Sequence, residues 1–319
     1  MNQPLTLDEA SAVVLDNDAE LRAGGTDTTA RRRGGVTRRA SVQIPLLPSL
    51  HGIVRQADGT TRIGALTGVA ELCADPGLQA GYPALARTAG ALATPQIRTA
   101  GTLGGNLLQH NRCWYYRNPH FSCYRDGGDG CPARTGVHPN AAVIDQGPCI
   151  APHPSSIAIA LLVHDAQVDV HERGTLSVAD LYGDGSDPTR DHLLAPQEIL
   201  TAVTLPAPLP GERAAYNRAI SRAEAEWPLV EAVARVTVSD DVVTAVAVAA
   251  GGIAHTPLRL PEVEDALVGR RPTPEILLSA ATAATERCSP LPQTRYKVEL
   301  LRDTVLDVLE KAIGNAPVR

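Results

Sequence analysis

Four of the six cysteines gather in one short part of the chain, where they could bind a metal. Cys113, Cys123, Cys131 and Cys149 fall within 37 residues with the spacing C-x9-C-x7-C-x17-C, which lacks the paired C-x2-C knuckles of most structural zinc sites. Disulfide frameworks are typical of small secreted scaffolds, and the rest of this chain of 319 residues does not look like one. Four thiolates with irregular spacing favour an iron–sulfur cluster, while zinc and structural or disulfide cysteines remain alternatives.

Aromatic and cationic side chains gather in the same region, residues 110–150, which we call the cysteine loop. It holds five of the chain's aromatic residues, although these make up only 3 % of the sequence. This clustering predicts a packed, shielded loop, and nearby arginines could offset the negative charge of a four-thiolate cluster. The aromatic residues are Trp114, Tyr115, Tyr116, Phe121 and Tyr124, and the arginines are Arg112, Arg117 and Arg125.

Two glycine-containing segments precede the cysteine loop. The first glycine loop, residues 22–27, reads RAGGTD, and the second glycine loop, residues 94–109, reads TPQIRTAGTLGGNLLQ. Glycine lets a ligand approach the main chain closely, and successive exposed N–H groups can bind an anion. Taken alone, each segment is also compatible with a plain turn between core elements. Together they indicate a backbone cradle for a dinucleotide.

The segments AGGTD, TPQIRTAGTLGGNL and NRCWYYR resemble the FAD-binding subunits of the xanthine dehydrogenase family of molybdenum hydroxylases. Within that family, the four-cysteine loop is similar to the subgroup whose flavin subunit also carries a [4Fe–4S] cluster. That subgroup includes the flavin subunits of bacterial aldehyde oxidoreductases and the β subunit of 4-hydroxybenzoyl-CoA reductase. The cysteine spacing and the segment CIAPHPSS look closer to the aldehyde oxidoreductase kind.

The resemblance implies a set of cofactor contacts. The four loop cysteines would ligate the cluster, and both glycine loops would hold the FAD pyrophosphate. Ser156 stands near a position where the family often has an aspartate, so its contact would lack charge. Arg218 would lie near the isoalloxazine, with Arg222 and Trp227 as weaker candidates. The implied FAD contacts are Ala23, Gly24, Gly25, Thr26, Asp27, Thr94, Ile97, Arg98, Thr102, Gly104, Gly105, Asn106, Ser156 and Arg218.

One segment departs from the family pattern. Residues 28–39 read TTARRRGGVTRR, with five arginines, where the family usually continues with an apolar helix. We interpret this run as a solvated surface. The alternative is a basic patch that faces a diphosphate or an acidic partner subunit.

The expected fold class is α+β. The resemblance implies an FAD-binding domain of the vanillyl-alcohol-oxidase type with two sub-domains, over residues 1–205, with the cysteine loop inserted at about residues 110–150. A smaller C-terminal α+β domain, residues 211–319, would close over the flavin after the linker PAPLPG. We expect a helix at residues 5–21, two strands or a strand–helix pair at residues 214–220 and 230–238, and an apolar strand at residues 242–251. Two amphipathic helices should follow, at residues 274–288 and 297–313.

Composition excludes several function classes. The formal net charge is −6, and no aromatic residues interleave with the arginine run, so we expect no nucleic-acid partner. No apolar run is long enough to span a bilayer, so we expect no membrane contact. No signal peptide is visible in MNQPLTLDEA, which predicts a cytoplasmic chain, or a periplasmic one if a partner carries the signal.

No nucleophile–His–Asp set or H-E-x-x-H pattern is present, so catalysis would belong to cofactors. The resemblance implies an oxidoreductase subunit that passes electrons from [2Fe–2S] centres through FAD to an acceptor. Its partners would be a large molybdopterin-binding subunit and a small [2Fe–2S] subunit. The alternatives are a 4-hydroxybenzoyl-CoA reductase-like flavin subunit, a stand-alone FAD oxidoreductase and a zinc-loop binding module.

Overall fold

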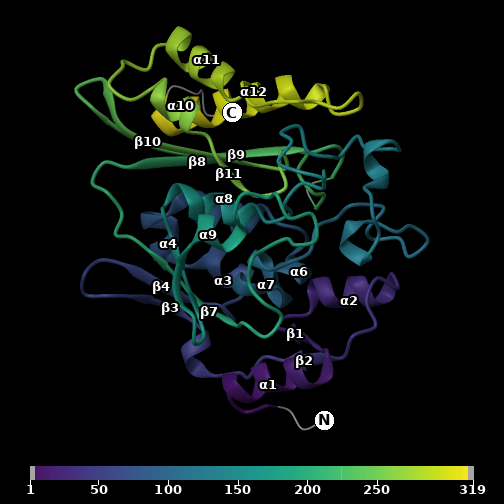
Figure 1. The fold of residues 1–319 in the computed structure, drawn as a ribbon. Helices are drawn as coiled ribbons and strands as arrows, with labels where there is room; N and C mark the ends of the chain where they lie inside the picture. The colour runs from purple at the N-terminus through teal and green to yellow at the C-terminus, as the bar shows by residue number, and fades with distance from the viewer. Residues whose placement is uncertain (1–3, 224, 315–319) are drawn as a thin grey trace.

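A computed structural model describes residues 4–223 and 225–314 of the chain. The chain begins with a small lobe at one end of the molecule (Figure 1). Helix α1 (Leu7–Asn17) starts at Thr6, whose hydroxyl accepts from the Glu9 N–H at 3.1 Å. We expected this helix to continue to residue 21, but Asp18 adopts a left-handed φ of 46° and ends it. Strands β1 (Glu20–Arg22) and β2 (Ser41–Gln43) then pair in parallel around α2 (Thr26–Arg33).

The second lobe is built on a five-stranded antiparallel sheet of order β3-β4-β7-β5-β6. Helices α7 and α9 contact this sheet, whereas α8 is buried at all eight positions and packs against α5, α7 and α9. The strands are β3 (Ile53–Arg55), β4 (Thr61–Gly64), β5 (Gln167–Val170), β6 (Gly174–Ser177) and β7 (Leu200–Leu205). The helices are α3 (Val69–Ala74), α4 (Pro76–Gly81), α5 (Pro83–Ala91), α6 (Pro95–Ala100), α7 (Leu103–Leu107), α8 (Ser156–Val163) and α9 (Val178–Tyr182).

The C-terminal region forms a four-stranded antiparallel sheet of order β11-β10-β9-β8. Residues 214–220 and 230–238 prove to be strands rather than a strand–helix pair, and the strand expected at residues 242–251 is present. Helix α12 packs against β8 and β9 (Figure 1). The opposite face of this sheet contacts α5 and α8 of the second lobe. The strands are β8 (Arg213–Ala219), β9 (Val230–Ser239), β10 (Val242–Gly251) and β11 (Leu258–Arg259), and the helices are α10 (Pro261–Asp265), α11 (Pro274–Ala283) and α12 (Tyr296–Ile313).

One apolar core joins the second lobe to the C-terminal sheet. Val233, Ala247 and Ala249 from that sheet pack in the same buried cluster as Leu85 and Ile159. A second cluster lies between the sheet and α10–α12. The C-terminal sheet is therefore buried on both faces, and its second covering layer comes from the other lobe.

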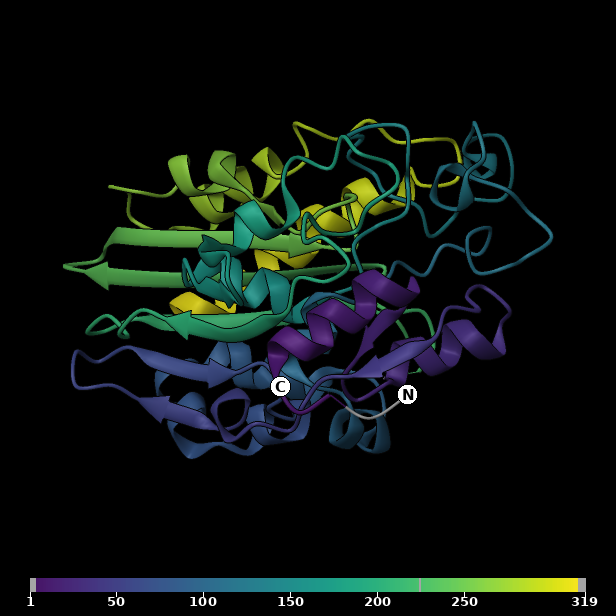
Figure 2. The ribbon, with the colours of Figure 1, turned by 60° about the horizontal axis from the view of Figure 1, so that its bottom comes forward.

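The cysteine loop lies outside these layers. Between α7 and α8 the chain forms only short 3₁₀ turns, at η2 (Tyr124–Asp126) and η3 (Pro132–Arg134). Figure 1 and Figure 2 both show the loop, in blue-teal, projecting beside α2 at one side of the molecule. Among the described residues, no helix is both long and apolar enough to cross a membrane.

Candidate functional site

A cleft of about 750 Å³ opens where the small lobe meets the second lobe. Both glycine loops line it, together with α2 and residues 189–200. Its size falls in the usual range of small-molecule and cofactor sites, about 300–1,000 Å³. We call it the glycine cleft.

The first glycine loop supplies a helix N-terminus to this cleft. Gly25 has a φ of +73° and stands at the N-cap of α2 without a side-chain cap. The first N–H groups of a helix have no intrahelical partner, and the helix dipole favours an anion there. A Cβ at Gly24 would lie 1.8 Å from the carbonyl oxygen of Ala100, so the two glycine loops touch backbone to backbone. Only glycine fits this contact.

The second glycine loop differs from the expected row of free N–H groups. The N–H groups of Leu103 and Gly104 donate to the carbonyls of Thr67 and Ala65, at 2.9 and 2.8 Å. The Gly105 N–H donates to the Thr102 hydroxyl at 3.1 Å. The loop is thus two short helices, α6 and α7, and the amides at the start of α7 are already paired. It offers a ligand a close approach to the main chain, whereas the unpaired donors belong to α2.

Asp27 ties the first glycine loop to the cysteine loop. Its carboxylate forms ion pairs with Arg112 and with Arg117, the latter at 2.9 Å, and accepts from the His110 N–H at 3.1 Å. Burial alone would raise the pKa of Asp27, but Arg112 and Arg117 outweigh it and lower that pKa to about 2. The carboxylate is therefore ionised at neutral pH, and its main role is to join the two loops.

The solvated interpretation of the arginine run was wrong for Arg31. This side chain is only 6 % exposed, lines the glycine cleft, and pairs with Glu20 at 2.6 Å and Asp27 at 3.3 Å. Arg32 and Arg33 are exposed, as expected. An α-helix places only some members of such a run on one face, so the run divides between cleft and solvent.

The predicted contacts divide between the cleft wall and its surroundings. Among the described residues, the structure brings eight of them to the glycine cleft: Ala23, Gly24, Gly25, Thr26, Asp27, Thr102, Gly104 and Gly105.

Three others, Thr94, Ile97 and Arg98, lie on α6 behind the cleft. The Thr94 hydroxyl caps that helix, accepting from the Ile97 N–H at 3.4 Å, and the Ile97 side chain is 45 % exposed. The Arg98 guanidinium donates to the carbonyl of Leu92 at 2.7 Å.

The remaining candidates lie near the start of α8 and the C-terminal sheet. Asn106 accepts a hydrogen bond from Ser155 at 2.6 Å, and Ser156 is buried as the first residue of α8. Arg218 stands in β8, opposite Glu231 of β9. Arg222 is exposed. The Arg112 guanidinium carbon lies 4.5 Å from the centroid of the Trp227 ring. Trp227 also lines a separate pocket of about 370 Å³ between the cysteine loop and the C-terminal sheet.

Sequence reasoning missed the segment that closes one side of the cleft, residues 189–200. It contributes Arg190, Asp191, His192 and Leu194 to the wall. Asp191 is buried, accepts from the Asn111 amide at 3.2 Å and His110 Nδ1 at 3.1 Å, and pairs with Arg125. The only signal in the sequence is the charged run Arg-Asp-His, which carries no recognisable motif.

The four loop cysteines line a single small cavity, the cysteine cavity. Cys113, Cys123, Cys131 and Cys149 come from separate stretches of the cysteine loop and converge there, although they are far apart along the chain. All are free thiols. Burial raises the pKa of Cys113, Cys123 and Cys149, which keeps these thiols protonated unless a metal replaces the proton.

The cavity also contains an unsatisfied cation. Arg125 lines it, and the Nε and Nη1 atoms of this guanidinium are buried without a hydrogen-bond partner. Buried donors normally find an acceptor, since leaving one unpaired costs about 1–3 kcal/mol. The sulfur atoms of a metal–thiolate group would supply both acceptors and negative charge. The donor set therefore fits an iron–sulfur cluster.

The spacing of the thiols bears on the choice between zinc and a cluster. Within the described parts of the chain, no three of these sulfurs lie within 4.8 Å of one another. Four thiolates around one zinc, each at about 2.3 Å, would place the sulfurs roughly 3.8 Å apart. The thiols as placed therefore do not form a ready-made zinc tetrahedron.

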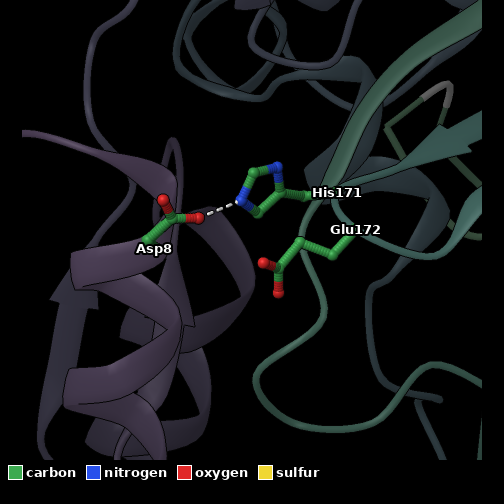
Figure 3. A group of neighbouring side chains, drawn as sticks. All are labelled: Asp8, His171 and Glu172. Atoms are coloured by element: carbon green, nitrogen blue, oxygen red, sulfur yellow. Dashed lines mark hydrogen bonds and ion pairs between the residues drawn. The ribbon is translucent and has the colours of Figure 1, made fainter.

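A different group does bring three potential ligand atoms within 4.8 Å, where the small lobe meets the β5–β6 turn of the second lobe (Figure 3). Asp8 lies in the first turn of α1, and His171 and Glu172 follow β5. His171 Nε2 lies 2.5 Å from the Asp8 carboxylate, while Asp8 and Glu172 are exposed. Asp8 and His171 link α1 to the β5–β6 turn, and none of the three residues lines the glycine cleft or the cysteine cavity.

Comparisons with known proteins agree with this geometry. The family model described as the FAD binding domain in molybdopterin dehydrogenase matches residues 1–208, and the CO dehydrogenase flavoprotein C-terminal domain matches residues 214–316. The chain is 34 % identical to the aldehyde oxidoreductase FAD-binding subunit PaoB of Escherichia coli K12 over 267 residues, covering 81 % of this chain and 80 % of that protein. It is 27 % identical to the carbon monoxide dehydrogenase medium chain of Hydrogenophaga pseudoflava, covering 99 % and 96 %.

Solved structures show the same fold. Carbon monoxide dehydrogenase from Hydrogenophaga pseudoflava, in a form without the Mo-pyranopterin moiety, matches with a TM-score of 0.77 at 24 % identity, covering 99 % of this chain and 97 % of that one. Quinoline 2-oxidoreductase from Pseudomonas putida 86 matches with a TM-score of 0.76. The expected family and α+β fold class are confirmed. The chain belongs to the FAD-binding subunits of the xanthine dehydrogenase and CO dehydrogenase family, the flavoprotein subunits of molybdenum hydroxylase-type oxidoreductases.

Proposed function

We propose that this chain is the FAD- and [4Fe–4S]-carrying electron-transfer subunit of a molybdenum-dependent aldehyde oxidoreductase-like complex. The single observation that carries the cluster is the convergence of four free cysteines and an unsatisfied Arg125 on one cavity. The 34 % identity to an aldehyde oxidoreductase FAD-binding subunit supports the reaction class.

The chain's own residues would bind and orient the cofactors. The N-terminus of α2 would hold the FAD pyrophosphate, while Gly24 and Gly104 let the cleft wall pack closely on the backbone of Ala100 and Ala65. Arg31 would add a fixed positive charge at the cleft wall. Bound FAD supplies the exchange of one or two electrons, and this chain supplies position and electrostatics.

The cysteine loop would shield and hold the cluster. Its four thiolates would be the ligands, and Arg125 would donate to their sulfurs. Tyr115 packs edge-on against Phe121, with ring centroids 4.8 Å apart, and Tyr115 also lines the cavity. These rings would limit water near the sulfurs.

We further propose that the partners are a large molybdopterin-binding subunit and a small [2Fe–2S] subunit, from which electrons reach FAD. The carbon monoxide dehydrogenase relative is named a medium chain, which implies larger and smaller companions for that protein. Co-purification with such subunits separates a complex from a stand-alone flavoprotein. Fractionation of cells separates a cytoplasmic complex from an exported one.

Iron analysis tests the cluster. Anaerobically purified chain should be brown and contain both iron and acid-labile sulfide, with flavin bands in its absorbance spectrum. Cys123→Ser should lose most of the iron and keep the flavin. Cys288→Ser is the matched control, because that half-buried thiol packs on the C-terminal core. Unchanged iron in Cys123→Ser removes Cys123 from the ligand set, and a colourless chain holding one zinc supports a zinc-loop module instead.

A further inference from the structure

The glycine cleft and the cysteine cavity share a wall. Tyr116 and Arg125 line both spaces. The Arg125 guanidinium lies over the Tyr116 ring, 5.1 Å from its centroid. Any change in the position of Arg125 therefore alters both sites at once.

Arg125 is held from the cleft side by Asp191. Their ion pair is almost fully buried, with side-chain exposures of 5 % and 2 %. Asp191 belongs to residues 189–200, the segment that closes the glycine cleft. The residues of the pair lie 66 positions apart in the sequence, so this contact fastens the cleft-closing segment to the cysteine loop.

A second link runs from the same carboxylate to a cysteine of the cavity. Asp191 accepts from the Asn111 side-chain amide at 3.2 Å, and the Asn111 side-chain oxygen accepts from the Cys113 N–H at 3.1 Å. His110 Nδ1 lies 3.1 Å from Asp191 as well. Asp191 is thus the shared anchor of the cleft-closing segment and the start of the cysteine loop.

The Arg125–Asp191 ion pair leaves two donors of the guanidinium without an acceptor in the protein alone. Only Nη2 of Arg125 has a partner, while Nε and Nη1 are buried without one. A buried cation with two unsatisfied donors is costly, and it gains the most from acceptors in the adjoining cavity. Filling the cysteine cavity with sulfur acceptors would fix Arg125, which in turn fixes Asp191 and its segment.

We propose that Arg125 and Asp191 couple the two sites, so that the chain binds FAD more tightly when the cysteine cavity holds its iron–sulfur group. This rests on the proposed function. Both residues act as positioning residues. Because coupling between two binding sites is reciprocal, bound FAD would also raise the affinity of the chain for the iron–sulfur group by the same factor.

The test compares FAD affinity with and without iron. FAD is titrated, with quenching of its fluorescence as the readout, into full-length chain that is either iron-loaded or stripped of iron under anaerobic conditions. We expect FAD to bind about 10-fold more weakly to the iron-free chain, within the range of typical site-to-site coupling. In Asp191→Asn and in Arg125→Gln, the ratio of the FAD dissociation constants of the iron-free and iron-loaded forms should fall close to one.

Glu20→Gln is the matched control. It removes the partner of Arg31, a buried arginine of the glycine cleft that does not line the cysteine cavity. This change should weaken FAD binding in both forms and leave the ratio at about 10-fold. If Asp191→Asn fails to fold, Arg125→Gln carries the test, because Asp191 then keeps His110 and Asn111 as partners.

Each outcome decides the proposal. The coupling is overturned if iron-free and iron-loaded wild type bind FAD equally well, or if folded Asp191→Asn and Arg125→Gln keep the wild-type difference in FAD affinity. Either result leaves the cluster in place. A chain that contains no iron after anaerobic purification overturns the cluster, and the coupling with it. Loss of the ratio in both variants but not in Glu20→Gln supports the proposal.

Discussion

Replacing Asp27 by asparagine should destabilise the protein more than any other single charge removal in the small lobe. The carboxylate is 13 % exposed and faces Arg31, Arg112 and Arg117. A neutral amide at this position would leave these cations without their shared anion at the N-terminus of α2, where a negative charge is also favoured by the helix dipole.

The magnitude follows from the pKa of Asp27, which falls from 3.8 to about 2. At 1.36 kcal/mol per pKa unit, this shift corresponds to about 2 kcal/mol. Removing one partner of a fully buried ion pair costs about 3–5 kcal/mol, and these arginines are partly exposed. We therefore expect Asp27→Asn to lower the free energy of unfolding by about 2–4 kcal/mol at pH 7.

The pH dependence has a definite sign. Because the pKa of Asp27 is lower in the folded state, its contribution is complete above the unfolded pKa of 3.8. It is lost as the pH falls through about 2. The difference between wild type and Asp27→Asn should therefore stay constant from pH 7 to about 5 and shrink below about pH 4.

Urea unfolding followed by circular dichroism at several pH values measures this difference. Asp58→Asn serves as the control, because that carboxylate is exposed and bonds only within its own turn, to Thr60. A cost of less than about 1 kcal/mol for Asp27→Asn at pH 7, the range of surface ion pairs, would refute this role of the carboxylate.

Two further predictions concern backbone contact and a buried cation. Gly24→Ala should weaken FAD binding at least about 10-fold, because a Cβ 1.8 Å from the Ala100 carbonyl oxygen forces the two glycine loops apart. Gly130→Ala, where nothing lies within 4 Å of the added Cβ, should bind FAD like wild type in the same fluorescence titration, and equal affinities of the two variants would contradict the close contact. Burial lowers the pKa of Lys297 from 10.5 to about 7, so the free energy of unfolding of wild type should rise as the pH increases from about 7 to 10. Lys297→Met should lack this rise in urea unfolding at matched pH values, and an identical slope in both proteins would rule out the assignment.

The sequence predicted the contacts that local chemistry determines. Gly24, Gly25 and Gly104 were recognisable because close backbone approach and a positive φ require glycine. Strands β9 and β10 were recognisable because they are long and largely apolar. The four cysteines stood out by their number within one segment, even though no spacing rule joined them.

The contacts that the sequence did not predict depend on tertiary structure. Asp191 approaches Arg125 only because residues 189–200 fold back over the cleft, and nothing near Asp191 in the sequence indicates this. The arginine run predicts a solvated Arg31, but the helical geometry of α2 places this side chain beside Glu20. The amides of the second glycine loop looked available because their partners, such as Ala65, lie in a distant part of the chain.

The shared core between the second lobe and the C-terminal sheet limits how this protein can be divided. Strands β9 and β10 both present apolar residues to α8 on one face, while α12 covers β9 and α10 covers β10 on the other. A fragment that starts after residue 211 would expose that face to water, and exposed apolar patches of this kind promote aggregation. The proline-rich segment thus separates two stretches of sequence that can be stable only when folded together, so exchange of C-terminal regions between related subunits must preserve the helix surface beneath them.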